Sequence, residues 1–543
     1  MKQIHKLARR AWFKTITASI LMLAAALLLG VVATLSSAAP RPTPTPTPTP
    51  APTTPQTWVV AFQNANSLPD NVDTIVTNAG GKILVKVPEI GGVAVTSSNP
   101  NFGATMVANV QVKAADIATP TQLIDPVVGT ESSTNNGGTG TATGSDAQPM
   151  PDSLGYEQWD KKKMNATPSG SYGIQPGRKD VRVFVIDTGV DQNHIDIAAN
   201  LSPQAPAGDS VSFVPSEPTI QDFNGHGTWT ASAVGGPING VGISGVAPNV
   251  TLVSGKVLNG AGSGLFIWTD QALVYAGIKH FDIVSASLGG YIPKNGDKSN
   301  SKANGPGDHT DYILLQRATQ FARSNGVLPI AALGNDGFDL SDGNFFRAFV
   351  EAPGEIAGWV GVSATGYPDD KAFYSNYGMG KTDVSAPGGN TRNYTGVPGS
   401  AVCPHNSLCR LIGAWSSTGG SAPADPVQQC VGPGNTPPCY LYGYVQGTSM
   451  ATPNAAGVAA LIISQYGDFT PGGNPNKVHM SPTQVEQYLQ ISANNQPCPQ
   501  PNTVNQGPGF PVPTATCQGD TGYNDFFGKG IVDALKAVTL KQN

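Results

Sequence analysis

The stretch Gln446–Gly457, with the sequence QGTSMATPNAAG, decides how this chain is interpreted. The small residues Gly447 and Thr448 precede Ser449, and Met450–Ile463 is rich in alanine and carries no charge, which predicts a buried helix. A serine at the start of a helix lies where backbone N–H groups and the helix dipole favour a developing negative charge. Ser449 is therefore a candidate nucleophile. A neutral hydroxyl also needs a base, and the base needs a group that orients it.

Two upstream segments supply candidates for the base and for its orienting group. Val181–Ile186 (VRVFVI) is rich in β-branched residues, which predicts a buried strand, and Asp187 follows at its C-terminal end. Ligands of open α/β sheets bind at that end of the strands. In Asn224–Thr228 (NGHGT), two glycines leave His226 unobstructed at a predicted helix start. Each segment alone has an ordinary explanation as a turn or a helix cap, but together, in the order Asp, His, Ser, they indicate nucleophilic catalysis.

Three blocks resemble the signature motifs of the subtilisin-like serine proteases, and the resemblance extends over about residues 158–537. The blocks are DTGVD at Asp187–Asp191, NGHGT at Asn224–Thr228 and GTSMATPN at Gly447–Asn454. The resemblance implies that Ser449 attacks the scissile carbonyl, that His226 takes the proton and passes it to the leaving amine, and that Asp187 orients the imidazole.

Two positions depart from the family pattern. Trp229 and Asn454 stand where family members usually carry a histidine. Neither residue belongs to the catalytic triad. We therefore expect a change of packing or hydrogen bonding beneath the site and no loss of its chemistry.

A further block resembles the segment that carries the family's oxyanion-hole asparagine. It is Ile330–Gly337 (IAALGNDG), so the resemblance assigns Asn335, together with the backbone N–H of Ser449, to stabilising the oxyanion. Taken alone, Asn335 could equally be a turn asparagine.

The resemblance also implies a peptide-binding cleft. Its expected substrate-binding residues are Ser287, Leu288, Gly289, Gly290, Ala331, Ala332 and Gly334. The segment 257–264 resembles the opposite edge of the cleft. A peptide held as an added strand is bound through its main chain, which predicts a broad sequence preference. The alternative is that these are ordinary strand ends with loop glycines.

A structural calcium site is implied by the segment Pro237–Ile243 (PINGVGI). Its length and glycine placement resemble the family's high-affinity calcium loop. Calcium binds six to eight oxygens, and bound to the native state it would add stability. A simple glycine-rich connection is the alternative. The expected ligands are the carbonyls of Pro237, Val241 and Ile243 and the side chains of Asp196 and Asn239, with Gln158 as a further candidate.

The N-terminus has the pattern of a secretory signal peptide. Residues 1–38 begin with five basic residues, continue with an apolar run and end in Ser-Ser-Ala. The apolar run is also long enough to span a bilayer if it is left uncut. Residues 39–56 are a Thr/Pro-rich linker of the semi-rigid polyproline type. We therefore expect export, with membrane contact only if the N-terminal segment is retained.

Residues 57–125 are expected to form a small α+β domain of their own. Strands are predicted at 58–62, 82–86, 92–96 and 110–112, with helices at 70–78 and 97–109. This βαββαβ order is typical of a ferredoxin-like domain. It resembles the inhibitory propeptide of the family. Residues 126–150 form a flexible Gly/Ser/Thr-rich linker, and self-processing is expected between Asp125 and Gly155.

All six cysteines follow residue 400, four of them in an insertion at about 389–443 that is rich in Pro and Gly and shows no periodicity. An even number in an exported chain suggests three disulfides, although six cysteines allow fifteen pairings. The insertion is either functional, narrowing the cleft, or a passive excursion. We expect nearest neighbours to pair and so to link local loops, as Cys403–Cys409, Cys430–Cys439 and Cys498–Cys517.

The remaining sequence alternates strands and helices and carries little charge. Alternation over residues 151–543 predicts an α/β fold of three layers, with a mostly parallel sheet and helices on both faces. Charged residues make up 12% of the chain, and the net charge of −5 falls to −10 without residues 1–38. This balance argues against a nucleic-acid partner.

These observations predict a secreted, calcium-stabilised serine endopeptidase that acts on polypeptides, is made as a self-processing zymogen bound to its own propeptide, and is monomeric. One alternative is a surface-anchored processing peptidase with narrow specificity. Another is an inactive binding protein on a protease fold.

Overall fold

The computed structural model describes residues 54–124, 149–295, 309–344, 346–392, 409–419, 423, 425–470, 478–507 and 510–541. All of them belong to one compact unit, Pro52–Asn543. The predicted signal peptide and most of the two predicted linkers lie outside the described residues. Within the described ranges, none of the helices combines the length and the apolarity needed to cross a membrane.

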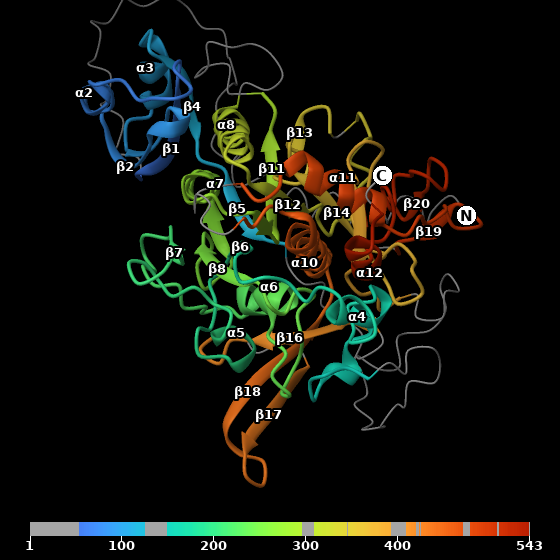
Figure 1. Ribbon diagram of the computed structural model, residues 1–543. Coiled ribbons are helices and arrows are strands. Elements are labelled where there is room, and N and C mark those ends of the chain that lie inside the picture. Colours follow the sequence, from blue (N-terminus) through green and yellow to red (C-terminus); the bar gives the residue numbers. More distant parts are fainter. Residues whose placement is uncertain are drawn as a thin grey trace, which may run out of the picture. The chain divides into compact units, whose positions relative to one another are not determined.

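A seven-stranded parallel sheet forms the centre of the larger domain (Figure 1). The inner strands are short and almost entirely buried, as expected when both faces of a parallel sheet are covered. In spatial order the strands are β15 (Val384–Pro387), β14 (Val360–Thr365), β12 (Leu328–Ala332), β10 (Ile283–Ala286), β6 (Arg182–Asp187), β8 (Thr251–Lys256) and β7 (Val211–Ser212).

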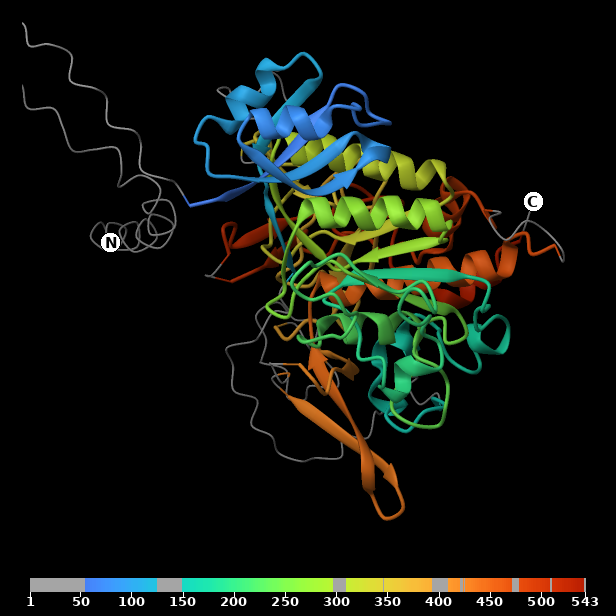
Figure 2. The same ribbon diagram turned by 90° about the vertical axis from the view of Figure 1, so that its left-hand side faces the viewer.

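Helices cover both faces of this sheet (Figures 1 and 2). On one face, α7 (Phe266–Lys279) and α8 (Thr310–Ser324) pack on side chains such as Phe184 and Val284. On the other face, an apolar core forms around α10 (Thr448–Tyr466). The helices that join α10 there are α6 (His226–Gly235), α11 (Pro482–Ser492) and α12 (Ala534–Val538). The predicted three-layer α/β fold is confirmed.

Residues 56–117 form a small α+β domain. Its antiparallel sheet has the order β2-β3-β1-β4, and its own core includes Trp58, Phe102 and Met106. The predicted βαββαβ order is therefore confirmed. The elements are β1 (Gln56–Phe62), α2 (Val72–Asn78), β2 (Gly81–Val87), β3 (Gly92–Ser97), α3 (Phe102–Ala108) and β4 (Val112–Ile117).

Two predicted boundaries in this domain were wrong. The second helix begins at Phe102 and not at residue 97, because Asn99 caps a turn there by accepting from the N–H of Asn101. The closing strand was predicted at 110–112, but β4 runs from Val112 to Ile117. Asn109 forms a turn before it, accepting from the N–H of Gln111.

The chain then leaves this domain and enters a second sheet. β5 (Pro120–Leu123) lies between β11 (Leu288–Pro293) and β9 (Ser263–Leu265), antiparallel to both, and β13 (Phe349–Ala352) extends the sheet beyond β11. Helix α8 makes further contacts with the small domain, since the Arg317 guanidinium donates to the carbonyls of Phe62 and Ile90.

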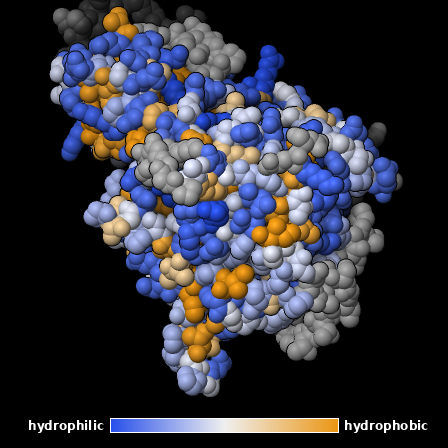
Figure 3. Space-filling view, viewed as in Figure 1, coloured by the Kyte–Doolittle hydropathy of each residue, from blue (hydrophilic) through white to orange (hydrophobic). Residues whose placement is uncertain are grey.

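The insertion before α10 is more regular than the sequence suggested. Instead of an aperiodic loop, its described part forms the antiparallel strands β16 (Leu411–Trp415), β17 (Pro426–Gly432) and β18 (Thr436–Val445). Figure 3 shows apolar side chains on the projecting β17–β18 hairpin.

Two predicted disulfides are confirmed. Cys430–Cys439 links paired positions of β17 and β18. Cys498–Cys517 flanks the short strands β19 (Thr503–Asn505) and β20 (Thr514–Thr516). Cys409 is disulfide-bonded, but its predicted partner Cys403 lies outside the described residues.

The buried face of α10 should carry much of the stability. Leu461→Ala removes a side chain with 0% exposure and should lower the free energy of unfolding by about 2–5 kcal/mol. Ile491→Ala on α11, where the side chain is 69% exposed, should change it by only about 0.5 kcal/mol or less. Melting temperatures in a Ser449→Ala background, which excludes self-digestion, would measure both. Equal shifts would contradict the assignment of α10 to the core.

Candidate active site

Asp187 and His226 form a buried pair at the C-terminal edge of the parallel sheet. Asp187 ends β6 and His226 begins α6, and both have exposures of 1% or less. The imidazole Nδ1 lies 2.8 Å from Asp187 Oδ1 and 3.0 Å from Oδ2. The hydroxyl of Thr230 and the N–H of Thr188 also donate to this carboxylate. A carboxylate on Nδ1 fixes the ring so that Nε2 points the opposite way.

Ser449 is the second residue of α10 and faces a carbonyl of its own chain. The preceding Gly447 is fully extended and serves as the N-cap. The Ser449 hydroxyl donates to the carbonyl of Ile124 at 2.7 Å, with the carbonyl of Ser287 at 3.4 Å. In return, the hydroxyl of Ser287 donates to the carbonyl of Ser449 at 2.8 Å. The serine side chain is therefore held at the end of strand β5.

Asn335 follows β12 and presents its amide nitrogen beside the serine. Its Oδ1 accepts from both the N–H and the hydroxyl of Thr448, each at 2.9 Å. With Oδ1 committed in this way, Nδ2 points at Gly447 and lies 3.1 Å from the place where a Cβ would be. Thr448, which sequence reasoning did not single out, thus orients the amide. Asn335 Nδ2 and the N–H of Ser449 are placed to act as paired donors.

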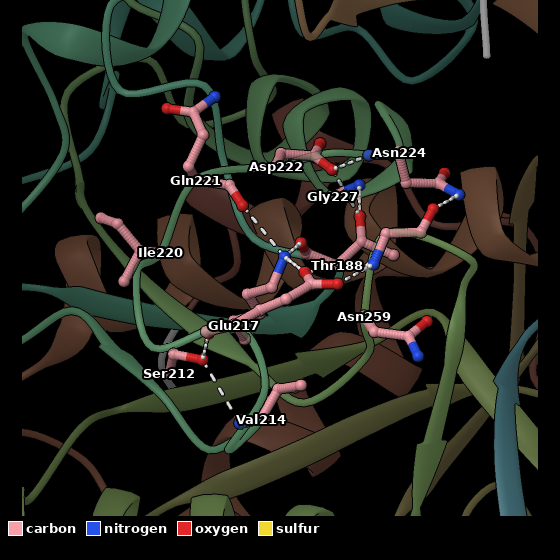
Figure 4. A network of polar contacts seen from close by, with 12 residues as sticks. Thr188, Ser212, Val214, Glu217, Ile220, Gln221, Asp222, Asn224, Gly227 and Asn259 are labelled. Atoms are coloured by element: carbon pink, nitrogen blue, oxygen red, sulfur yellow. Dashed lines mark hydrogen bonds and ion pairs between the residues drawn. The ribbon is translucent and has the colours of Figure 1, made fainter. Parts of the chain in front are cut away.

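A second buried carboxylate, Asp222, organises the loop before His226 (Figure 4). Its Oδ1 accepts from the Thr188 hydroxyl and from the N–H groups of Asn224 and Gly225, each at 2.9 Å. Its Oδ2 accepts from the N–H and the hydroxyl of Thr228. Sequence reasoning missed Asp222, although an aspartate shortly before NGHGT is the expected signal of a capping turn.

The same network extends to the edge of the cleft through Glu217 (Figure 4) and a buried lysine. Lys256, at the end of β8, donates to the carbonyls of Thr188 and Gln221 and pairs with Glu217 at 2.8 Å. Glu217 in turn accepts from the N–H of Gly260. Partial burial raises the pKa of Glu217, but these two contacts outweigh it and hold that pKa below its usual value. One ion pair therefore connects the turn after Asp187 with the glycine-rich edge.

The two predicted edges of a peptide cleft are occupied by strand β5. Leu288 and Gly289 pair with Leu123 and Gln122, and the other side of β5 pairs with residues 263–265. The N–H of Leu123 also donates to the carbonyl of Gly262 at 2.8 Å. The cleft thus holds an extended peptide between two strands, as the sequence predicted for a substrate.

The remaining predicted substrate residues lie in strand β12 and directly after it. Ala331 and Ala332 belong to β12, and Gly334 follows with a φ of 101°. A Cβ on Gly334 would meet the amide nitrogen of Asn376. Glu351 lies nearby, its Cδ 3.6 Å from that Cβ position. Burial raises the pKa of Glu351 well above its ordinary value, Asp336 and Glu355 add to the shift, and a backbone hydrogen bond from Gly290 opposes it.

The two departures from the family pattern are accommodated by packing. Asn454 accepts from the buried ammonium of Lys161 at 2.7 Å and donates to the carbonyl of Pro387. Trp229 donates from its ring nitrogen to the carbonyl of Gly443 in β18. Both side chains are fully buried, so the change is one of contacts beneath the site, as predicted.

Comparison with known sequences identifies related proteins. A profile of the subtilase family of peptidases matches residues 178–530. Alkaline elastase YaB of Bacillus sp. (strain YaB) is 32% identical over 315 residues, which cover 58% of this chain and 60% of that protein. Subtilisin Savinase of Lederbergia lenta is 30% identical over 52% of this chain and 76% of its own length. The chain thus spans about three fifths of the first of these relatives.

Solved structures with the same fold have lower identity. The epidermin leader peptide processing serine protease EpiP from Staphylococcus aureus has a TM-score of 0.64 at 21% identity, covering 90% of this chain and all of that chain. Fervidolysin from Fervidobacterium pennivorans, described as a keratinolytic enzyme related to subtilisin, has a TM-score of 0.60 at 19% identity, covering 90% and 61%. At this identity the likeness shows the fold alone.

The predicted calcium loop is closed by hydrogen bonds. The Asn239 amide donates to Asp196 Oδ1 at 3.0 Å, and the N–H of Ile243 and the hydroxyl of Tyr442 donate to Oδ2. The N–H groups of Asn239 and Gly240 point at Asp152. Calcium needs converging oxygen lone pairs, whereas Asp196 here faces three donors, so this arrangement does not fit the ion.

The calcium prediction can be decided by chelation. With the loop closed by Tyr442, excess EDTA should leave the melting temperature of the Ser449→Ala protein unchanged. Tyr442→Phe should lower its free energy of unfolding by about 1–3 kcal/mol, because Asp196 loses a buried partner. Tyr440→Phe, on the same strand, is the matched control. A melting temperature that falls with EDTA and recovers with added calcium would show that the ion binds after all.

Proposed function

The chain belongs to the subtilase family, and on that premise we propose that it is a serine endopeptidase that hydrolyses polypeptides through Asp187, His226 and Ser449. One observation carries this proposal. A peptide strand lies between the two edges of the cleft, and the carbonyl of its last described residue, Ile124, accepts a hydrogen bond from the Ser449 hydroxyl at 2.7 Å. The hydroxyl of the candidate nucleophile is therefore within hydrogen-bonding distance of a peptide carbonyl in the cleft.

Each group in the site has one part in the reaction. Ser449 Oγ attacks the carbonyl carbon while His226 takes the hydroxyl proton on Nε2, and the adjacent Asp187 carboxylate stabilises the imidazolium. Negative charge develops on the carbonyl oxygen, where Asn335 Nδ2 and the N–H of Ser449 receive it. His226 then protonates the leaving amine, and water releases the acyl group by the same steps in reverse.

We further propose that residues 57–124 are an inhibitory propeptide that the enzyme removes from itself. The small domain is bound by polar contacts to helix α8: Asp116 accepts from the N–H and hydroxyl of Thr310, and Asp311 accepts from the N–H of Thr119. Strand β5, which follows this domain, fills the cleft. This arrangement supports cleavage of the bond between Ile124 and Asp125, one bond before the range expected from the sequence.

Export before this cut is part of the same proposal. It rests on the signal-like pattern of residues 1–38 alone, since these lie outside the described residues. A surface-anchored processing peptidase remains the second candidate. EpiP is described as a leader peptide processing protease. A cleft that selects one particular side chain would favour this second candidate.

Self-processing can be tested by comparing the wild-type chain with Ser449→Ala. The wild-type protein should be cut between Ile124 and Asp125, giving a mature form that begins at Asp125, because Ser449 lies at that carbonyl. Ser449→Ala should stay intact. Intact-mass measurement and N-terminal sequencing would locate the cut. If Ser449→Ala is trimmed equally, another protease makes the cut, and a first cut elsewhere would refute the assignment to Ile124.

The oxyanion role of Asn335 predicts a defect in turnover. Asn335→Ala should lower kcat by about 10²–10³-fold with little change in KM, because its amide contacts the substrate oxygen mainly after charge has developed. Steady-state hydrolysis of a chromogenic peptide would measure both constants. Asn495→Ala, at an exposed asparagine, should leave them unchanged. A normal kcat in a folded Asn335→Ala protein would rule out this role.

A further inference from the structure

The side chain of Ile124 ends against a buried carboxyl group. Gly289 has no side chain, and the Cδ1 atom of Ile124 lies 3.3 Å from the point that a Cβ on Gly289 would occupy. Oε1 of Glu351 lies closer still to the same point. The tip of the residue at the nucleophile and the Glu351 carboxyl thus meet at this glycine. Because Gly334 borders the same carboxyl, Glu351 lies between the two glycines that flank this part of the cleft.

Strand β13 delivers Glu351 to this place. Strand β13 pairs with β11, which is the neighbour of β5. In this pairing Tyr291 lies opposite Glu351, and Gly290 lies opposite Ala352. Glu351 is 2% exposed. A Cβ at position 289 would collide with its carboxyl, so the glycine there makes room for the acid.

Within the described part of the chain, no positive charge balances this carboxyl. Among the residues that the structure describes, Glu351 takes part in no ion pair, whereas its neighbour Glu355 pairs with Lys381 at 2.7 Å. The other nearby acid, Asp336, accepts from the hydroxyl of Tyr291. Burying a carboxylate without a cation is costly, so such a group is either kept neutral or completed by a ligand of opposite charge.

Resting on the proposed function, we propose that Glu351 makes this enzyme prefer lysine or arginine at the substrate position that Ile124 occupies, the residue whose carbonyl is attacked. A long basic side chain entering beside Gly289 reaches the carboxyl and supplies the missing charge, with its aliphatic part on the path that Ile124 takes. A charge-assisted contact of this kind is among the strongest that a side chain can make. The proposal replaces the broad preference expected from main-chain binding alone.

The chain's own strand does not use this charge. Ile124 brings an aliphatic side chain to this point, and none of the described cations pairs with Glu351. The segment of β5 that ends at Ile124 is therefore a less favoured substrate than one that ends in lysine or arginine. Exchanging this one residue for arginine should therefore speed self-processing.

The test uses mature enzyme and fluorogenic peptides of the form Pro-Thr-Gln-Leu-X, with X as Arg, Lys, Ile, Leu or Glu. For wild-type enzyme, kcat/KM should be on the order of 10²-fold higher with Arg or Lys than with Ile. Glu351→Gln should lose that advantage, so that its kcat/KM for the Arg and Lys peptides falls to the level of the Ile peptide. Glu486→Gln removes a carboxyl that pairs with Arg323 and should leave the preference unchanged.

A second measurement follows self-processing of the full-length chain, so it does not require a separately purified mature variant. In the full-length chain, Ile124→Arg should be processed faster than wild type, and combining it with Glu351→Gln should abolish the gain. A wild-type preference for Ile or Leu over Arg would overturn the proposal, as would a Glu351→Gln enzyme that still selects Arg.

The outcomes separate this proposal from the one on which it rests. If the wild-type enzyme cleaves the Ile peptide and Ser449→Ala does not, serine endopeptidase activity stands whatever the preference proves to be. If the wild-type enzyme cleaves none of the peptides and takes up no serine-directed fluorophosphonate, the endopeptidase assignment itself fails.

Discussion

The register of three parallel strands places the groups of the site next to one another. Ile186 of β6, Ala286 of β10 and Ala331 of β12 are paired across the sheet. The strands end within a few residues of this row, so Asp187, Ser287 and Asn335 emerge at one edge. A parallel sheet buried on both faces tolerates no slip, because a shift of one residue would turn every side chain to the opposite face. The chemistry therefore depends on the packing of β-branched residues at a distance from it.

Buried carboxylates do different work according to the groups that face them. Asp222 accepts five donors and fixes the loop that carries His226. Asp196 accepts three and closes the loop at 237–243, with Tyr442 reaching it from the β17–β18 hairpin. Glu351 has no cation among the described residues and borders the substrate strand. The carboxylates that accept several hydrogen bonds hold loops in place. The carboxyl of Glu351, in contrast, can be paired by a positively charged ligand.

Motifs and strand patterns predicted the sheet, its helices, the βαββαβ domain and the closeness of Asp187 to His226, because these follow from local periodicity and from blocks of adjacent residues. Other features depend on partners far away in the chain. Nothing near Glu351 reveals that its carboxyl reaches Gly289, and nothing near Asp196 reveals Tyr442, 246 residues further on. The hairpin was missed because Pro and Gly obscured the alternation of Tyr440, Tyr442 and Tyr444, and β4 because its turn residues were taken for the strand.

Strand β5 belongs to the same chain as the cleft that it occupies, so a cut in the connection would make activity depend on protein concentration. While the chain is intact, strand β5 is tethered to the cleft and occupies it at an effective concentration in the millimolar range typical of short linkers. A cut after Ile124 removes the tether but none of the contacts on α8 and β11. On the proposed function, the severed domain is a separate inhibitor whose occupancy of the cleft obeys mass action. If the proposed self-processing occurs, a concentrated pool of cut protein stays inhibited, and dilution alone releases the enzyme.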